Sequence, residues 1–190
     1  MKDVAVLFSG GLDSTVLATI AARAGRLAAA AFVDYGQPAV EQEREAAQRW
    51  CGRNGSRLVE LRAAFPAAAA LANGVGASGP RVIPCRNLIL IALAASSAPE
   101  IGAREVWYGA SGADQASYPD CRPEFAAALS VVLALDGGVV VRAPLVGMLR
   151  SEVRALAVAL QVVIADTWSC YEPRQDGTQC GECDSCRQDR

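Results

Sequence analysis

The sequence contains no histidine, and Lys2 is its only lysine. Without imidazole, neither histidine-based acid–base catalysis nor histidine ligation of a metal is available. A Walker-type phosphate loop is also excluded, because it ends in Gly-Lys-Ser or Gly-Lys-Thr. Arginine supplies the other positive charges, and the formal net charge is −2. This balance does not indicate a nucleic-acid-binding surface, so a nucleic-acid partner is not expected.

Long apolar runs are lacking as well, although 52% of the residues are hydrophobic. Runs such as 88–95 fall well short of the roughly 18 residues that a membrane span requires, so no membrane partner is expected. The start, Met1-Lys2-Asp3, does not resemble a secretory signal. Seven cysteines in such a chain indicate reduced thiols that serve a metal or chemistry, and the expected location is cytoplasmic.

Strand-like and helix-like segments alternate along the chain. Strands are predicted at 4–8, 27–35, 57–61, 105–110 and 139–143, and helices at 14–24, 39–53, 86–99, 123–135 and 151–160. This alternation is typical of βαβ units and predicts an α/β fold with a doubly wound parallel sheet. Ligands of such sheets bind beyond the carboxyl ends of the strands.

Two further features concern the organisation of the chain. The Gly- and Pro-rich segment 73–84 is predicted to form a mobile loop over the ligand-binding edge. No internal repeat or long linker divides the sequence. Residues 1–166 are therefore expected to form one domain, with 167–190 as a small cysteine-rich element packed on it.

The stretch 9–14, Ser-Gly-Gly-Leu-Asp-Ser, follows an apolar strand and opens a helix. Its glycines let the backbone approach a ligand closely, and the N–H groups at a helix start attract negative charge. Asp13 would repel a phosphate unless a cation lies between them, so Mg²⁺ is expected at this site. A turn that only packs the helix on the sheet is the less favoured alternative. The predicted phosphate-binding residues are Phe8, Ser9, Gly10, Gly11, Leu12, Asp13 and Ser14.

Four cysteines near the end of the chain follow the pattern C-x9-C-x2-C-x2-C, and they are Cys170, Cys180, Cys183 and Cys186. Four thiolates at short spacing in a reducing compartment predict one structural Zn²⁺ per chain, tetrahedral and without an open position. Two disulfides are the less favoured alternative.

The glycine-rich stretch resembles the pyrophosphate loop (PP-loop) of the N-type ATP pyrophosphatases, which split ATP between its α- and β-phosphates and form adenylates. The wider pattern of motifs is Asp-Tyr-Gly-Gln at 34–37, Pro-Cys-Arg-Asn at 84–87, Tyr-Pro-Asp-Cys-Arg at 118–122 and Thr-Trp-Ser-Cys at 167–170. With these motifs, the chain resembles the 7-cyano-7-deazaguanine synthase family over nearly its whole length.

The resemblance implies a homodimeric ligase with the adenine-nucleotide alpha-hydrolase (PP-loop) type of fold. Such an enzyme uses ATP to adenylate the carboxylate of 7-carboxy-7-deazaguanine. Ammonia then gives an amide, which is activated again and dehydrated to 7-cyano-7-deazaguanine, a queuosine precursor. The first motif would bind the phosphates of ATP with Mg²⁺.

The resemblance also implies roles for individual residues. The catalytic residues are expected to be Asp13, Ser14, Arg86, Arg122 and Arg150. The substrate-binding residues are expected to be Tyr35, Arg86, Asn87, Asp114, Tyr118, Asp120 and Arg122. Carboxylates such as Asp114 and Asp120 suit the N–H groups of a guanine-like base, and Arg122 suits charge that develops on the activated carboxyl group.

Three alternatives stay open at this stage. Cys85 stands where the family usually has glycine, so a relative could pass the activated acid through a Cys85 thioester to another acceptor, such as a protein amine. A non-catalytic deazapurine- or nucleotide-binding module is a second alternative, although the retained Asp13 speaks against it. A tRNA-thiolating enzyme would need a basic surface, which the net charge of −2 does not indicate.

Arg150 replaces the lysine that the family usually carries, which keeps the charge but changes the donor geometry.

Overall fold

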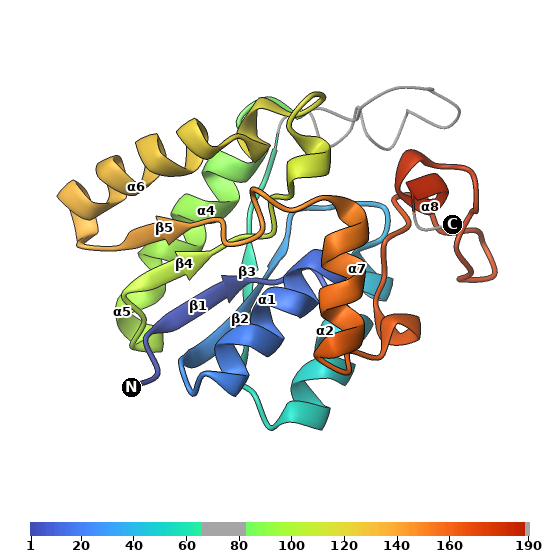
Figure 1. Ribbon diagram of the computed structural model, residues 1–190, viewed down its shortest axis with the longest axis horizontal. Helices are drawn as coiled ribbons and strands as arrows, with labels where there is room; N and C mark the ends of the chain where they lie inside the picture. Colours follow the sequence, from blue (N-terminus) through green and yellow to red (C-terminus); the bar gives the residue numbers. More distant parts are fainter. Residues whose placement is uncertain (66–82, 189–190) are drawn as a thin grey trace.

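A computed structural model describes residues 1–65 and 83–188 of the chain. Its centre is a parallel sheet of five strands in the order β3-β2-β1-β4-β5 (Figure 1). The strands are β1 (Val4–Leu7), β2 (Leu27–Asp34), β3 (Leu58–Arg62), β4 (Glu105–Trp107) and β5 (Val140–Arg142). The predicted α/β fold with a parallel sheet is confirmed. The loop predicted at 73–84 lies almost entirely outside the described residues.

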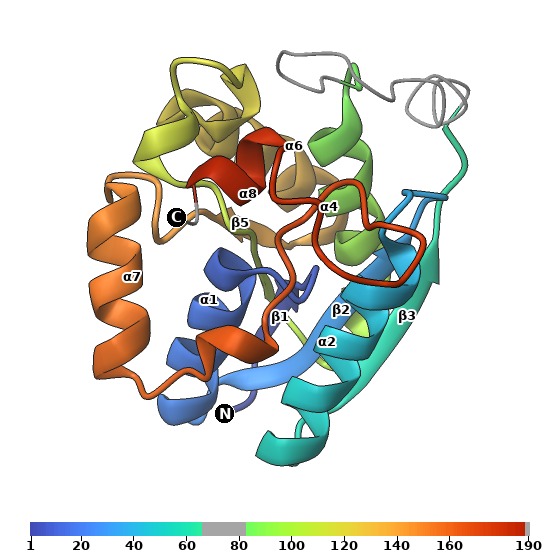
Figure 2. The same cartoon turned by 90° about the vertical axis from the view of Figure 1, so that its right-hand side faces the viewer.

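Helices cover both faces of the sheet, as a doubly wound fold requires (Figures 1 and 2). The helices are α1 (Leu12–Arg23), α2 (Val40–Asn54), α4 (Arg86–Ser96), α5 (Ala98–Ile101), α6 (Pro123–Gly137), α7 (Arg150–Ala159) and α8 (Asp184–Gln188). In the described ranges, no helix is long and apolar enough to span a membrane.

The two helical layers follow from the alternation of side chains along the strands. Val4 and Val6 of β1 point to one face, where they pack with apolar residues of α1, α2 and α7. Ala5 lies between them and points to the other face, where it packs with residues of α4, α5 and α6. A strand buried on both faces explains the continuous apolar run that precedes the glycine turn.

Two element boundaries differ from the sequence prediction by three residues, and the others differ by at most two. The helix predicted at 86–99 ends at Ser96, and the short α5 follows it. Pro99 is the reason, because it lacks the N–H that would continue the helix and its ring clashes with the preceding turn. The strand predicted at 105–110 ends at Trp107, because at Gly109 the chain turns to pass close to Asp13 at the start of α1.

The strand order also defines where a ligand can bind. β1 lies between β2 and β4, and the chain winds outward from it in opposite directions. The loops that leave β1 and β4 therefore separate at the carboxyl edge of the sheet and leave a crevice there.

Cys85 precedes α4 and adopts a left-handed conformation, with φ of 59° and ψ of 15°. This conformation costs an L residue about 1–2 kcal/mol, whereas glycine adopts it freely. The Cys85 side chain is exposed to solvent. The backbone at this position therefore favours glycine over cysteine.

Replacement of Cys85 tests this conformation. Cys85→Gly is expected to raise the free energy of unfolding by up to about 1 kcal/mol, because the relief of strain exceeds the added entropy of the unfolded chain. Cys85→Val is expected to lower it, because a β-branched side chain fits the left-handed region poorly. Urea unfolding of the three proteins measures both changes. Equal stability of all three would contradict the left-handed conformation.

Candidate functional site

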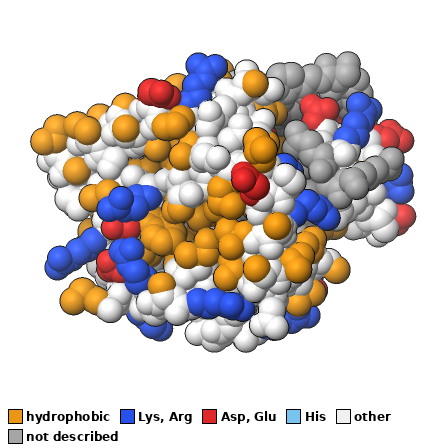
Figure 3. Space-filling model, viewed as in Figure 1, with side chains coloured by type: hydrophobic (Ala, Val, Ile, Leu, Met, Phe, Trp, Pro, Cys, Tyr) orange, Lys and Arg blue, Asp and Glu red, His pale blue; other side chains and the backbone are white. Residues whose placement is uncertain are grey.

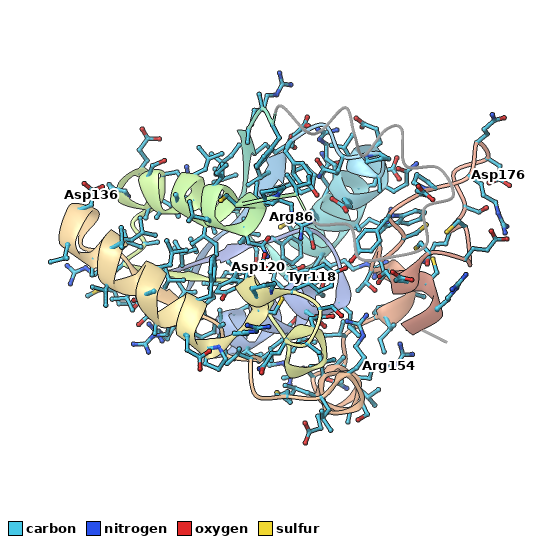
Figure 4. The ribbon with its side chains drawn as sticks, turned by 90° about the horizontal axis from the view of Figure 1, so that it is seen from above. Arg86, Tyr118, Asp120, Asp136, Arg154 and Asp176 are labelled. Atoms are coloured by element: carbon cyan, nitrogen blue, oxygen red, sulfur yellow. The ribbon has the colours of Figure 1, made fainter. Side chains whose placement is uncertain are left out.

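A cavity of about 260 Å³ lies beyond the carboxyl ends of β1, β2 and β4. Its walls come from the glycine-rich turn, the end of β2, the start of α4, the loop after β4, the start of α7 and the segment after Thr167. Figure 4 shows three of the labelled side chains, Arg86, Tyr118 and Asp120, close together near the middle of the molecule. Most of the predicted site residues line this cavity: Phe8, Ser9, Gly11, Leu12, Asp13, Ser14, Tyr35, Arg86, Asn87, Asp114, Tyr118, Asp120 and Arg150.

The glycine-rich turn presents hydroxyl groups and helix N–H groups to the cavity. Ser9 Oγ lies 3.3 Å from Ser14 Oγ and accepts a hydrogen bond of 3.3 Å from the Gly11 N–H. Thr15 N donates the first helical hydrogen bond of α1, to Gly11 O at 3.0 Å. The first N–H groups of a helix have no acceptor inside it and favour an anion at the N-terminus. This turn has the geometry of an anion-binding site.

Gly10 does not line the cavity, but it sets the position of the turn. Its φ is 76°, and a Cβ there would lie 2.8 Å from Glu43 O and 2.9 Å from Ala46 Cβ of α2. On the other side, Trp168 N donates a hydrogen bond of 2.9 Å to Gly10 O. The turn is thus held between α2 and the C-terminal segment, at a distance that only glycine permits.

Asp13 and Arg150 form an ion pair across the cavity wall. Arg150 Nη1 lies 3.2 Å from Asp13 Oδ1 and 3.3 Å from Oδ2, although the two residues are 137 positions apart in the sequence. Only 20% of the Arg150 side chain and 14% of the Asp13 side chain are exposed. The arginine therefore neutralises the carboxylate next to the anion-binding turn.

Arg86 brings positive charge to the opposite wall. Its guanidinium group lies near the hydroxyls of Tyr35 and Tyr171 and near the Asp120 carboxylate. Burial raises the pKa of Tyr35, so this phenol stays protonated and can donate a hydrogen bond. An arginine among phenols and a carboxylate is suited to hold a second anionic group.

The Tyr-Pro-Asp-Cys-Arg motif is only partly directed to the cavity. Cys121 lines it, and burial together with the Asp120 charge raises the pKa of the Cys121 thiol to about 12, so this thiol is neutral. Asp114 accepts a hydrogen bond of 2.9 Å from Ser111 Oγ. Arg122 is exposed, and its Nε donates to Gln115 O at 3.2 Å. The structure therefore does not bring Arg122 together with the other predicted residues.

The cavity is also lined by a hydrogen-bonded pair that the sequence motifs did not assign to the site, the buried Gln37 and the half-buried Glu43. Gln37 Nε2 donates to Glu43 Oε2 at 2.8 Å, and Gln37 Oε1 accepts from Tyr35 N at 2.9 Å. Burial raises the pKa of Glu43 to about 7. Glu43 precedes the buried Ala46 and Ala47 by three and four positions, so helical periodicity already places it on the inward face of α2.

The four C-terminal cysteines come together in space. Their sulfur atoms all lie within 4.8 Å of one another, and Cys180 Sγ is 3.9 Å from Cys186 Sγ. Backbone N–H groups support the sulfurs, since Cys180 N donates to Cys170 Sγ at 3.2 Å and Cys183 N donates to Cys180 Sγ at 3.3 Å. This cluster can hold a metal.

The C-terminal segment that carries the four cysteines also completes the cavity. It contributes Trp168, Ser169, Tyr171 and Ser185 to the walls, none of which the sequence analysis assigned to the site. Trp168 Nε1 donates to Cys170 O at 2.8 Å, which ties the cavity wall to a cysteine of the cluster. Trp168, Ser169 and Tyr171 lie within two positions of Cys170 in the sequence, and this proximity was the available signal that they belong to the site.

Comparisons with known proteins agree with these motifs. The model of the family described as queuosine biosynthesis protein QueC matches residues 3–190. The chain is 38% identical over 201 residues to the 7-cyano-7-deazaguanine synthase of Novosphingobium aromaticivorans, covering 96% of this chain and 85% of that protein. It is 37% identical over 204 residues to the 7-cyano-7-deazaguanine synthase of Pelobacter propionicus, covering 98% and 90% of the two chains.

Solved structures of lower identity share the fold. The U34-tRNA thiolase NcsA of Methanococcus maripaludis, which carries a 4Fe-4S cluster, matches with a TM-score of 0.59 and 19% identity over 98% of this chain and 63% of that one. The NMN synthetase of Francisella tularensis matches with a TM-score of 0.52 and 18% identity over 96% and 70%. The family match and the near-complete coverage by the synthases decide the assignment, and the chain belongs to the queuosine biosynthesis protein QueC family.

Proposed function

We propose that the protein is an ATP-dependent ligase that adenylates 7-carboxy-7-deazaguanine and, with ammonia, forms 7-cyano-7-deazaguanine. The observation that carries the proposal is one cavity lined by an anion-binding turn and by the motifs around Arg86 and Asp120, in a chain that is 38% identical to a 7-cyano-7-deazaguanine synthase. Transfer to a protein amine is not favoured, because Cys85 is exposed and is not among the residues that line the cavity. A non-catalytic module is not favoured either, because the curated relatives are named as synthases.

The ATP phosphates would occupy the turn and the start of α1. Asp13 would hold Mg²⁺ between its carboxylate and the phosphates, which removes the repulsion between two anions. Arg150 pairs with Asp13, lines the same cavity and would compensate charge on a phosphate as well. Phe8 and Leu12 line the same wall and would exclude water from the nucleotide.

The deazapurine acid would occupy the wall formed by α4 and the loop after β4. Asp114 and Asp120 would accept hydrogen bonds from the N–H groups of the base, and Tyr35 and Tyr118 would contact its ring. Arg86, at the start of α4, would orient the carboxylate, with Asn87 beside it. Arg122 stays outside this arrangement because its side chain is exposed and bonded to the backbone.

The chemistry follows from this placement. A carboxylate oxygen attacks the α-phosphate of ATP, pyrophosphate leaves, and the acid becomes an acyl-adenylate. Ammonia forms the C–N bond while the C–O bond breaks and AMP leaves with the electron pair. A second activation, on the amide oxygen, and loss of AMP give the nitrile. Arg86 and Arg150 would stabilise the negative charge that develops on the transferred groups.

Product analysis tests the proposed reaction, and Asp13→Asn tests its first step. The unchanged protein should convert the acid, ATP and ammonia into nitrile, AMP and pyrophosphate, as measured by mass spectrometry. Asp13→Asn should lower acid-dependent ATP–pyrophosphate exchange by about 100-fold or more, because a neutral amide binds Mg²⁺ poorly. The control is Asp136→Asn, at an exposed position far from the cavity (Figure 4), which should not change exchange. Formation of ADP, or full exchange by Asp13→Asn, would contradict the proposal.

We further propose that the cysteine cluster holds Zn²⁺, one ion per chain. A single ion with Zn–S bonds of about 2.3 Å places its tetrahedral ligands about 3.8 Å apart, which matches the 3.9 Å between Cys180 and Cys186. Thiolates around a four-iron cluster lie further apart, because each binds a different corner. Four protein ligands leave no position for a substrate, so the ion would be structural and would hold 167–190 as an element against the cavity.

Loss of the metal should therefore affect both stability and the site. Cys183→Ser is expected to abolish zinc binding, lower the melting temperature and weaken binding of the acid, because Trp168 and Tyr171 lose their support. Elemental analysis, thermal unfolding and calorimetric titration with the acid measure these three effects. The exposed Cys85→Ser is the matched control. Iron with a visible absorption band, or unchanged acid affinity without metal, would contradict this assignment.

A second copy of the chain would act as a partner. Helix α6 exposes Val131, Val132 and Leu135, with 60%, 59% and 84% of their surface accessible. Figure 3 shows hydrophobic side chains in orange at the upper left, where Figure 1 places α6. Three large apolar side chains on one helix are costly to leave in water and suit a homodimer interface.

The proposed reaction requires ATP and the proposed zinc site requires reduced thiols, so the cytoplasm is the proposed location.

Sedimentation velocity tests the dimer. The unchanged chain should sediment as a dimer, and Val132→Glu should shift it to the monomer, because a charge would be buried in the interface. Glu124→Gln, at the exposed start of the same helix, is the control. A monomer at every concentration would contradict the proposal.

A further inference from the structure

Glu43 is a carboxylate in a cavity that also contains an anion-binding turn. Such a carboxylate repels phosphate unless a cation or a proton neutralises it. Asp13 pairs with Arg150, but the only hydrogen bond from the described residues to the Glu43 carboxyl group comes from the neutral Gln37 amide, at 2.8 Å. The proposed binding of ATP and the base gives Glu43 no role.

The position of Glu43 is fixed from both ends. Its backbone oxygen packs against Gly10 of the turn, which sets this part of α2 beside the phosphate site. Its Oε2 is held by Gln37, whose amide group is itself oriented, because Gln37 Oε1 accepts from Tyr35 N at 2.9 Å and Nε2 donates to Val33 O at 3.3 Å. Gln37 is only 5% exposed, so this orientation is enforced by burial. No hydrogen bond from the described residues reaches Oε1 of Glu43, so this oxygen can bind a ligand in the cavity.

The charge state of Glu43 suits proton transfer near neutral pH. Burial raises its pKa to about 7, while the Gln37 hydrogen bond and the Arg86 charge oppose that rise. The Tyr35 phenol also faces it and stays protonated. A glutamate of ordinary pKa, about 4.3, would be a far weaker base. Above pH 7 the group is mainly a carboxylate and can accept a proton.

We propose that Glu43 binds the ammonium ion and removes its proton, so that ammonia is released inside the cavity. This inference rests on the proposed function. Ammonium has no free electron pair and cannot attack, and its N–H groups match a carboxylate oxygen and a phenol oxygen at the same site. The site would thus take a small cation with N–H donors, a ligand different from ATP and from the deazapurine acid.

The proposed step is balanced. The Glu43 carboxylate takes one proton from NH₄⁺ and becomes a carboxylic acid. The freed electron pair of NH₃ forms the C–N bond to the acyl carbon. The C–O bond to phosphate breaks, and AMP leaves with the electron pair of that C–O bond. The nitrogen then loses one further proton to water to give the neutral amide. Glu43 returns its proton to water before the next cycle, since a pKa of about 7 permits both directions.

The experiment compares Glu43→Gln with Glu41→Gln. Both lie in the first turn of α2 and lose the same charge, but Glu41 is exposed and pairs with Arg44 on the surface. Each protein is assayed in three ways: acid-dependent ATP–pyrophosphate exchange, amide and nitrile formation with ammonium, and hydroxamate formation with hydroxylamine. Hydroxylamine is unprotonated at neutral pH, so it needs no base. Thermal unfolding checks that the variants fold.

Glu43→Gln is expected to lower kcat/KM for ammonium by about 10²- to 10⁴-fold at pH 7, the usual contribution of a general base. Exchange and hydroxamate formation should stay within about twofold of the unchanged protein, because adenylation does not need this base. The ammonium defect should shrink as the pH rises and free ammonia becomes abundant. Glu41→Gln should behave as the unchanged protein does in all three assays.

Any other result would contradict either the role of Glu43 or the proposed function. Normal ammonium use by Glu43→Gln would overturn the role of Glu43. An equal loss of exchange and hydroxamate would also overturn it, because Glu43 would then serve adenylation or only the local structure. Absence of exchange in the unchanged protein would instead overturn the proposed function.

Discussion

The site depends on one missing side chain, that of Gly10. A Cβ at this position would lie 2.8 Å from Glu43 O and 2.9 Å from Ala46 Cβ, closer than packed atoms allow. Because the side chain is absent, the exit of β1 approaches α2 and still turns into α1 with its N–H groups toward the cavity. The same contact fixes where the Glu43 side chain begins. One glycine thus sets both the anion-binding turn and the carboxylate that we assign to ammonium.

The C-terminal segment closes the site from the other side. Trp168 N bonds to the oxygen of Gly10, and Trp168 Nε1 bonds to Cys170 O within the cysteine cluster. A continuous path of contacts therefore joins α2, the turn and the C-terminal segment that carries the cysteine cluster. A structural ion in this position would stabilise the cavity as well as the end of the chain, because Tyr171 directly follows Cys170 of the cluster and lines the cavity.

The sequence predicted those features of the site that depend only on residues close together in the chain. The turn at 9–14, the start of α4 at Arg86 and the cysteine spacing were readable because each is a short segment with its own geometric requirement. The pairing of Asp13 with Arg150, 137 residues apart, was not readable because the sheet brings them together. Arg122 lies within a site motif and directly precedes α6, and its exposed side chain donates to Gln115 O, a placement that the motif alone did not indicate.

The carboxylates that line the cavity have different interaction partners. These partners indicate which role each carboxylate has in the proposed reaction. Asp13 pairs with an arginine, next to the anion-binding turn where we propose Mg²⁺. Asp114 accepts a hydrogen bond from Ser111, and Asp120 lies near Arg86. Glu43 alone among them has a neutral amide as its hydrogen-bond partner and a pKa raised to about 7 by burial. A group that must gain and lose a proton in each cycle needs that intermediate environment, because a strong ion pair would keep it charged and full burial without a donor would keep it neutral.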